Sequence, residues 1–136
     1  MAHALFGYDG PCKNIHGHTY HLYVTLIGEV LNEQGNSKNG MVIDFTDLKK
    51  IVSENVINVF DHALVLNYNS PQAKLIESNF VFEKVIYTSY QPSCENLLLD
   101  FLERIKEYLP KHVFINSLKL EETPTSYAEW FLSDNN

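Results

Sequence analysis

The sequence predicts an α+β fold. Two segments place apolar residues at helical spacing, several others are rich in β-branched and aromatic residues, and their order lacks the regular βαβ alternation of a doubly wound sheet. The chain of 136 residues has about the length of one domain, and neither an internal repeat nor a linker divides it. We therefore expect residues 1–136 to form a single domain.

The first half contains one long predicted strand and one predicted helix. Residues 18–30 are rich in β-branched and aromatic side chains with partial two-residue alternation, and a cluster of turn-forming residues follows at 32–40. A helix is expected next, because apolar residues recur at spacings of three and four up to Phe60. Asp44 and Thr46 are both suitable N-caps for it.

The second half contains another predicted helix between strands. Ser93 can cap this helix, and a wide apolar stripe follows it until Pro110 ends the pattern. An irregular segment and three strands complete the expected elements, at residues 67–71 for the irregular segment and 85–88, 113–121 and 127–132 for the strands.

Composition and charge exclude several classes of protein. A formal net charge of −7 and a pI near 5.2 argue against a nucleic-acid partner, which attracts an excess of lysine and arginine. Cys12 and Cys94 are too few for a disulfide framework, and no signal-peptide pattern opens the chain. No apolar run approaches the roughly 20 residues that cross a membrane. We expect a soluble, cytoplasmic protein that binds neither nucleic acid nor membrane.

Histidines near the start of the chain have the spacing of metal ligands. His16 and His18 are separated by one residue, so in an extended segment both project to the same face. His3 is the natural third ligand if its segment lies beside theirs. A catalytic zinc site commonly has three protein ligands and one open position. Chance pairing of histidines in a surface strand is the alternative.

Other residues can carry chemistry, and spacing alone leaves their roles open. Cys12 can be a fourth ligand of a closed zinc site, or a nucleophile or base beside an open one. Cys94 is more typical of a small buried apolar group. Asp61 can orient the neighbouring His62 imidazole. Glu121 and Glu122 face opposite sides of a strand, so at most one of them points inward.

Residues 12–18 read Cys-Lys-Asn-Ile-His-Gly-His and follow Ala-His-Ala-Leu at residues 2–5. This pattern resembles the 6-pyruvoyltetrahydropterin synthase superfamily. The spacing of three residues between Cys12 and His16 resembles its bacterial 6-carboxytetrahydropterin synthase branch, since the animal enzymes have a longer gap. Further segments resemble family motifs in the same order, namely residues 40–49, 61–62, 92–96 and 121–123.

The resemblance implies the tunnelling fold, in which a four-stranded antiparallel sheet carries two helices on one face. Such subunits assemble into homohexamers, as dimers of trimers, with active sites between subunits. The family normally has a strand before its Ala-His pair, whereas Met1 directly precedes Ala2, so we expect that first strand to be absent from the sequence.

The resemblance also implies the chemistry. The substrate is 7,8-dihydroneopterin triphosphate, and the products are 6-carboxy-5,6,7,8-tetrahydropterin, acetaldehyde and triphosphate, on the route to queuosine-type 7-deazapurines. The implied roles are zinc (Zn²⁺) ligands at His3, His16 and His18, the catalytic base at Cys12, a relay pair at Asp61 and His62, the pterin anchor at Glu122, and pocket walls at Ser93 and Cys94.

Three alternatives remain at this point. The chain resembles the 6-pyruvoyl branch as well, which differs in how far the substrate side chain is cleaved. A zinc hydrolase would use the three histidines to activate water, and Cys12 would be incidental. A non-catalytic zinc module would use Cys12 as a fourth ligand, and it would unfold when the metal is removed.

Overall fold

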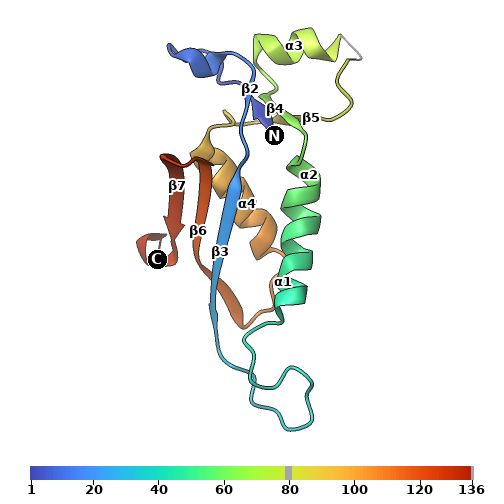
Figure 1. Cartoon of the computed structure of the whole chain (residues 1–136), viewed down its shortest axis with the longest axis vertical. Helices are drawn as coiled ribbons and strands as arrows, with labels where there is room; N and C mark the ends of the chain where they lie inside the picture. The colour runs from blue at the N-terminus through green and yellow to red at the C-terminus, as the bar shows by residue number, and fades with distance from the viewer. Residues whose placement is uncertain (79–80, 136) are drawn as a thin grey trace.

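The computed structural model describes residues 1–78 and 81–135 as an elongated molecule with two sheets (Figure 1). The strands are β1 (Ala2–His3), β2 (His16–Gly17), β3 (His21–Gly28), β4 (Leu64–Asn67), β5 (Val85–Thr88), β6 (Val113–Thr123) and β7 (Ser126–Phe131). The helices are α1 (Phe45–Val52), the π-helical segment η2 (Ser53–Ile57), α2 (Asn58–Phe60), α3 (Pro71–Glu77) and α4 (Cys94–Lys106), with 3₁₀ turns η1 (Pro11–Lys13) and η3 (Leu132–Asn135).

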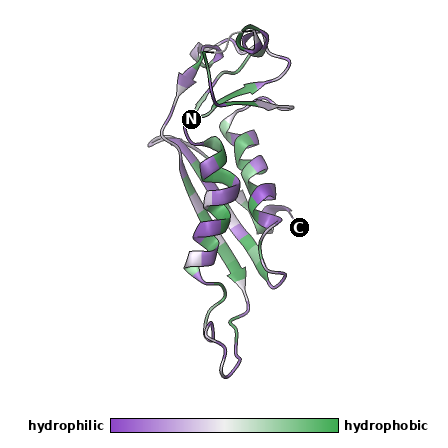
Figure 2. Cartoon of the chain, turned by 90° about the vertical axis from the view of Figure 1, so that its right-hand side faces the viewer, coloured by the Kyte–Doolittle hydropathy of each residue, from purple (hydrophilic) through white to green (hydrophobic). Residues whose placement is uncertain are grey.

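The larger sheet is antiparallel, in the order β3-β6-β7, and the helical segment from α1 to α2 packs with α4 on one of its faces (Figures 1 and 2). The segments α1, η2 and α2 follow one another without a break, and α4 lies beside them. Buried apolar side chains from η2, α2, α4 and β6 fill the space between the layers, including Val56, Phe60, Leu97, Phe101, Ile105, Ile115, Leu118 and Leu120. The predicted α+β class, with two helices on one face of an antiparallel sheet, is confirmed.

This antiparallel sheet has three strands in the described part of the chain, where the resemblance implies four. Ala2 and His3, which precede β3 in the sequence, pair with β2 and β4 and not with β3. The outer edge of β3 therefore has no neighbouring strand among the described residues.

The smaller sheet has the order β2-β1-β4-β5 and lies above the larger one in Figure 1. The pairing of β1 with β2 is antiparallel, whereas β1 with β4 and β4 with β5 are parallel. All four residues of β4 are buried, as expected for a central parallel strand. The β1–β2 pair of this sheet places His3 opposite His16, two of the predicted metal ligands.

Strands β1, β2 and β4 of the smaller sheet, and helix α3 beside it, were not predicted from the sequence. Residues 67–71 were expected to be irregular, but Asn67 ends β4 and Pro71 begins α3, so only residues 68–70 are irregular. Helix α3 has seven residues, and Ser70 caps it by accepting a hydrogen bond from the Ala73 amide at 3.0 Å. An amphipathic pattern cannot develop over so short a helix, which explains the wrong prediction.

The other predicted elements are confirmed, with small shifts at their ends. The first long strand is β3, shorter than residues 18–30, and the later strands are β5, β6 and β7. Of the two proposed caps for α1, Asp44 is the one used, because its carboxylate accepts a hydrogen bond from the Thr46 amide at 2.8 Å. Ser93 caps α4 as predicted. None of the described helices is long and apolar enough to span a membrane.

Candidate active site

Three histidines, one from β1 and two from the extended segment that begins with β2, meet at one point. His3 and His16 are register partners across the β1–β2 pair, and His18 follows two residues after His16 on the same side of the extended chain. Their candidate ligand atoms all lie within 4.8 Å of one another. The predicted juxtaposition of His3 with the His16–His18 pair is therefore present.

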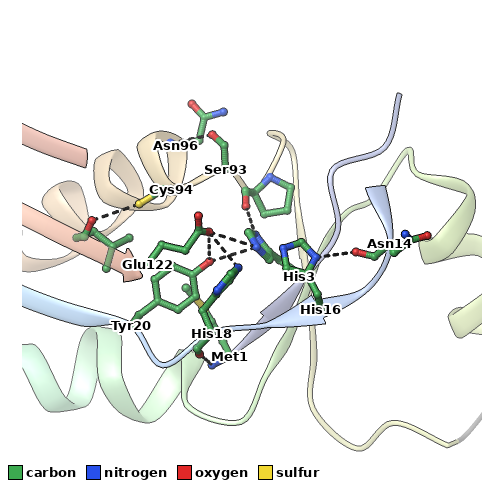
Figure 3. Close-up of polar contacts among 12 residues, drawn as sticks. Met1, His3, Asn14, His16, His18, Tyr20, Ser93, Cys94, Asn96 and Glu122 are labelled. Atoms are coloured by element: carbon green, nitrogen blue, oxygen red, sulfur yellow. Dashed lines mark hydrogen bonds and ion pairs between the residues drawn. The ribbon is translucent and has the colours of Figure 1, made fainter. Parts of the chain in front are cut away.

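The Nδ1 atoms of His3 and His16 contact backbone carbonyls, and the Nε2 of His3 also lies 3.3 Å from the Tyr20 hydroxyl oxygen. The Nδ1 of His3 donates to the Pro92 carbonyl at 2.6 Å, and the Nδ1 of His16 donates to the Asn14 carbonyl at 2.7 Å (Figure 3). The Nε2 atoms of His16 and His18 are buried and have no hydrogen-bond partner among the described residues. A histidine that binds a metal through one ring nitrogen usually donates the N–H of the other nitrogen to a carbonyl or carboxylate. The three imidazoles therefore fit a zinc ion.

Burial also favours the metal-binding state of His3. This side chain is 2% exposed, and the loss of solvation lowers its pKa below the ordinary value, although the hydrogen bond to Pro92 opposes this. A lowered pKa keeps the imidazole neutral near pH 7, with a lone pair on Nε2.

Glu122 and Tyr20 lie against the histidine cluster. The Oε1 of Glu122 is 3.4 Å from the Nε2 of His3 and accepts a hydrogen bond from the Tyr20 hydroxyl at 2.8 Å (Figure 3). Burial and this hydrogen bond raise the pKa of Tyr20, so the phenol remains a donor. Tyr20 was not predicted as a site residue, although it continues the same-face spacing of His16 and His18.

The predicted substrate-binding residues line one pocket of about 390 Å³. Its wall includes His3, Cys12, Ser93, Cys94 and Glu122. Five predicted site residues, drawn from residues 3 to 122 of the chain, thus line one cavity. Cys12 contributes from η1 but is not a member of the histidine cluster, which among the described residues consists of the three imidazoles.

Glu121 faces away from this pocket, as the strand alternation requires. Its carboxylate lies 3.7 Å from the Lys119 ammonium and 3.8 Å from the His21 ring. Cys94 lies on the pocket wall, where its thiol donates to the Leu120 carbonyl at 3.3 Å. Burial raises the pKa of the Cys94 thiol to about 11, so at neutral pH it is uncharged.

Asp61 and His62 are not in the pocket that holds Cys12. They line a second pocket of about 420 Å³ together with His18 and Tyr20. The His18 ring contacts the His3 ring, and the Tyr20 hydroxyl donates to Glu122. His18 and Tyr20 therefore form part of the wall between the two pockets. The Nδ1 of His62 is 3.0 Å from an Asp61 oxygen, and this hydrogen bond holds the pKa of Asp61 below its usual range. The pair itself forms as predicted, but within one chain it does not face Cys12.

The whole chain was compared with known proteins. Residues 1–131 match the family model described as 6-pyruvoyl tetrahydropterin synthase. The chain belongs to the 6-pyruvoyl tetrahydropterin synthase family. This membership confirms the resemblance seen in the sequence and identifies the chain as an enzyme of the pterin synthase type.

Individual relatives agree with this membership. The chain is 34% identical over 132 residues to a 6-carboxy-5,6,7,8-tetrahydropterin synthase of Haemophilus influenzae, covering 96% of this chain and 91% of that one. It is 30% identical to the protein of the same name from Rickettsia typhi, covering 93% and 90%. The structure of the Caenorhabditis elegans 6-pyruvoyl tetrahydropterin synthase superimposes with a TM-score of 0.62 at 26% identity, covering 96% and 86%. The predicted tunnelling fold is therefore confirmed.

The histidine cluster predicts a specific loss of zinc affinity. Replacing His16 with alanine (His16→Ala) should weaken zinc binding by more than about 100-fold, because loss of an outer contact alone costs about 10- to 100-fold. Competition with a chromogenic chelator measures this. His21→Ala is the matched control, since that ring is 60% exposed and outside the cluster. Equal losses in the two variants would contradict the assignment.

The raised pKa of Cys94 predicts slow alkylation. In a Cys12→Ser variant, where Cys94 is the remaining cysteine, iodoacetamide should react at pH 8 roughly 100-fold more slowly than with an ordinary thiol of pKa about 8.5. The rate should rise about tenfold per pH unit towards pH 11, because the thiolate is the reactive form. The same variant unfolded in urea provides the ordinary thiol. A rate that levels off below pH 9 would show that the pKa is not raised.

Proposed function

We propose that the chain is a zinc-dependent 6-carboxy-5,6,7,8-tetrahydropterin synthase. It converts 7,8-dihydroneopterin triphosphate to the 6-carboxy product, acetaldehyde and triphosphate. The observation that carries this proposal is the cluster of three imidazoles, of which His3 also lines the pocket that holds Cys12 and Glu122. The Nε2 atoms of His16 and His18 are buried without a hydrogen-bond partner among the described residues. The names of the relatives from Haemophilus influenzae and Rickettsia typhi support the carboxy-forming branch.

Each pocket residue has a defined part in the proposed reaction. A zinc ion at the three histidines would supply Lewis acidity towards the oxygens of the substrate side chain. Cys12, as a thiolate, removes the proton from the neighbouring carbon. Glu122 accepts two parallel hydrogen bonds from the pterin ring, and the Tyr20 hydroxyl fixes this carboxylate in place. Ser93 and Cys94 form the wall beside the ring.

We also propose that the active enzyme is a homohexamer, a dimer of trimers, whose sites lie between subunits. The separation of Asp61 and His62 from the Cys12 pocket supports this arrangement. His62 is 90% exposed, so its imidazole is accessible to a second copy of the chain. In such a site, the His62 imidazole of one subunit passes protons near the Cys12 of another, because an imidazole can both donate and accept a proton.

We place the enzyme in the cytoplasm, on the route to queuosine-type 7-deazapurines. Both cysteines are free, which suits a reducing compartment. The acidic net charge disfavours a nucleic-acid partner, and we propose that the chain's partner is its small-molecule substrate.

The first test is to incubate the zinc-loaded protein with 7,8-dihydroneopterin triphosphate and identify the products by mass, with an acetaldehyde assay in parallel. Cys12→Ala should lower kcat by about 100- to 10,000-fold, the usual contribution of a general base, while zinc content stays unchanged. Pyruvoyltetrahydropterin without acetaldehyde would move the chain to the 6-pyruvoyl branch. Near-normal turnover by Cys12→Ala would favour the zinc hydrolase.

If the active sites lie between subunits, two inactive variants should restore activity to each other in a mixed oligomer. Cys12→Ala and His62→Ala should each be inactive, whereas co-expressed chains should recover roughly a quarter of the wild-type sites, because random assembly leaves that share with both residues intact. The kcat per zinc of the purified mixed oligomer measures the recovery. Sites built within one chain would show no recovery at all, since every chain carries one of the two changes.

A further inference from the structure

The turn that joins α2 to β4 holds His62 in an unusual backbone conformation. Its φ is 57°, in the left-handed region that few residues other than glycine adopt. Such a conformation persists only where neighbouring groups impose it. Asp61 precedes it, and Ala63 follows with its amide bonded to the Phe60 carbonyl at 3.0 Å. These backbone contacts alone leave the Asp61 carbonyl to be satisfied from elsewhere.

Lys84 supplies the missing contact. Its ammonium donates to the Asp61 carbonyl at 2.6 Å and to the Asn58 carbonyl at 2.8 Å. These carbonyls lie at the end of a helix, where the last turn has no further helical donors and where a positive charge is favourable. Both hydrogen bonds are charge-assisted and therefore stronger than neutral ones.

The main chain of Lys84 holds the other side of the same turn. Its carbonyl accepts a hydrogen bond from the Leu64 amide at 3.0 Å, where β4 begins beside β5 (Figure 1). One residue thus contacts the turn at Asp61 through its side chain and at Leu64 through its backbone, and His62 lies between these two points. Lys84, His62 and His18 also line one open hollow of about 860 Å³.

We propose that Lys84 is a positioning residue, which clamps the Asp61–His62 turn so that the imidazole projects outward with its Nδ1 on the Asp61 carboxylate. The inference rests on the proposed role of His62 in proton transfer. The hydrogen bond from His62, and to a smaller degree the charge of Lys84, keep the pKa of Asp61 below its usual value. Asp61 is therefore ionised and remains an acceptor for the imidazole at neutral pH.

Three variants and a control test this role. Lys84→Met keeps the aliphatic stem and removes the donors, Lys84→Gln keeps one neutral donor group, and Lys84→Arg restores a charged donor. Lys106→Met is the control, since this lysine is 66% exposed and lies 3.5 Å from a neighbouring glutamate on α4. The readouts are kcat and KM with 7,8-dihydroneopterin triphosphate, zinc content, and the ring signals of His62 in ¹H–¹³C NMR spectra, assigned with His62→Ala.

We expect Lys84→Met to lower kcat by about tenfold with KM nearly unchanged, because a misplaced catalytic group slows the reaction without weakening binding. Its His62 ring signals should shift, Lys84→Gln should be intermediate, and Lys84→Arg should recover most of the activity. Zinc content should stay constant, and Lys106→Met should behave as wild type.

Unchanged His62 signals in the folded Lys84→Met and Lys84→Gln variants would overturn the proposal. So would a loss of unfolding free energy with kcat preserved, which is the result expected of a purely structural helix cap. A wild-type protein that does not convert the substrate would instead contradict the proposed function, and the NMR comparison would still decide whether Lys84 positions His62.

Discussion

The pairing of β1 with β2 is the constraint on which the rest of the site depends. It places His3 opposite His16, and the same two-residue strand pairs with β4 on its other edge. The amide of Ala2 donates to the Ala63 carbonyl at 2.8 Å, so β1 is also tied to the residue after His62. A strand of two residues has little stability of its own. Its position, and with it the metal centre, is determined by neighbours on both sides.

Charge relates the histidine cluster to the pocket that holds Cys12 and Glu122. The chain has a formal net charge of −7, and the pocket presents the Glu122 carboxylate beside the His3 imidazole, whose pKa burial lowers. Such a lining by itself repels a triphosphate. A zinc ion held by the three histidines, as proposed, would supply the local positive charge that the composition lacks, and it would favour the thiolate form of a nearby cysteine.

The sequence predicted those parts of the molecule that carry their own local signal. The α4 stripe and its Ser93 cap, the β6–β7 pair and the His16–His18 spacing all depend on residues close together in the chain. Strands β1, β2 and β4 depend instead on pairing between residues far apart in the sequence. Because β1 and β2 have only two residues each, they are too short to show the two-residue alternation of a strand. The position of His62 relative to Cys12 was equally beyond prediction, because it depends on how α2 ends against β4 and Lys84. Tyr20 was within reach, since it continues the alternation of His16 and His18.

The exposure of His62 and its strained backbone bear on the proposed assembly. A catalytic imidazole usually lies in a shielded cleft, yet this ring is 90% exposed and is held outward by its φ of 57° and by Lys84. Tyr20 and His18 stand between it and the pocket of its own chain. The held turn is therefore suited to present the imidazole to a pocket on another molecule, where docking would also remove it from solvent.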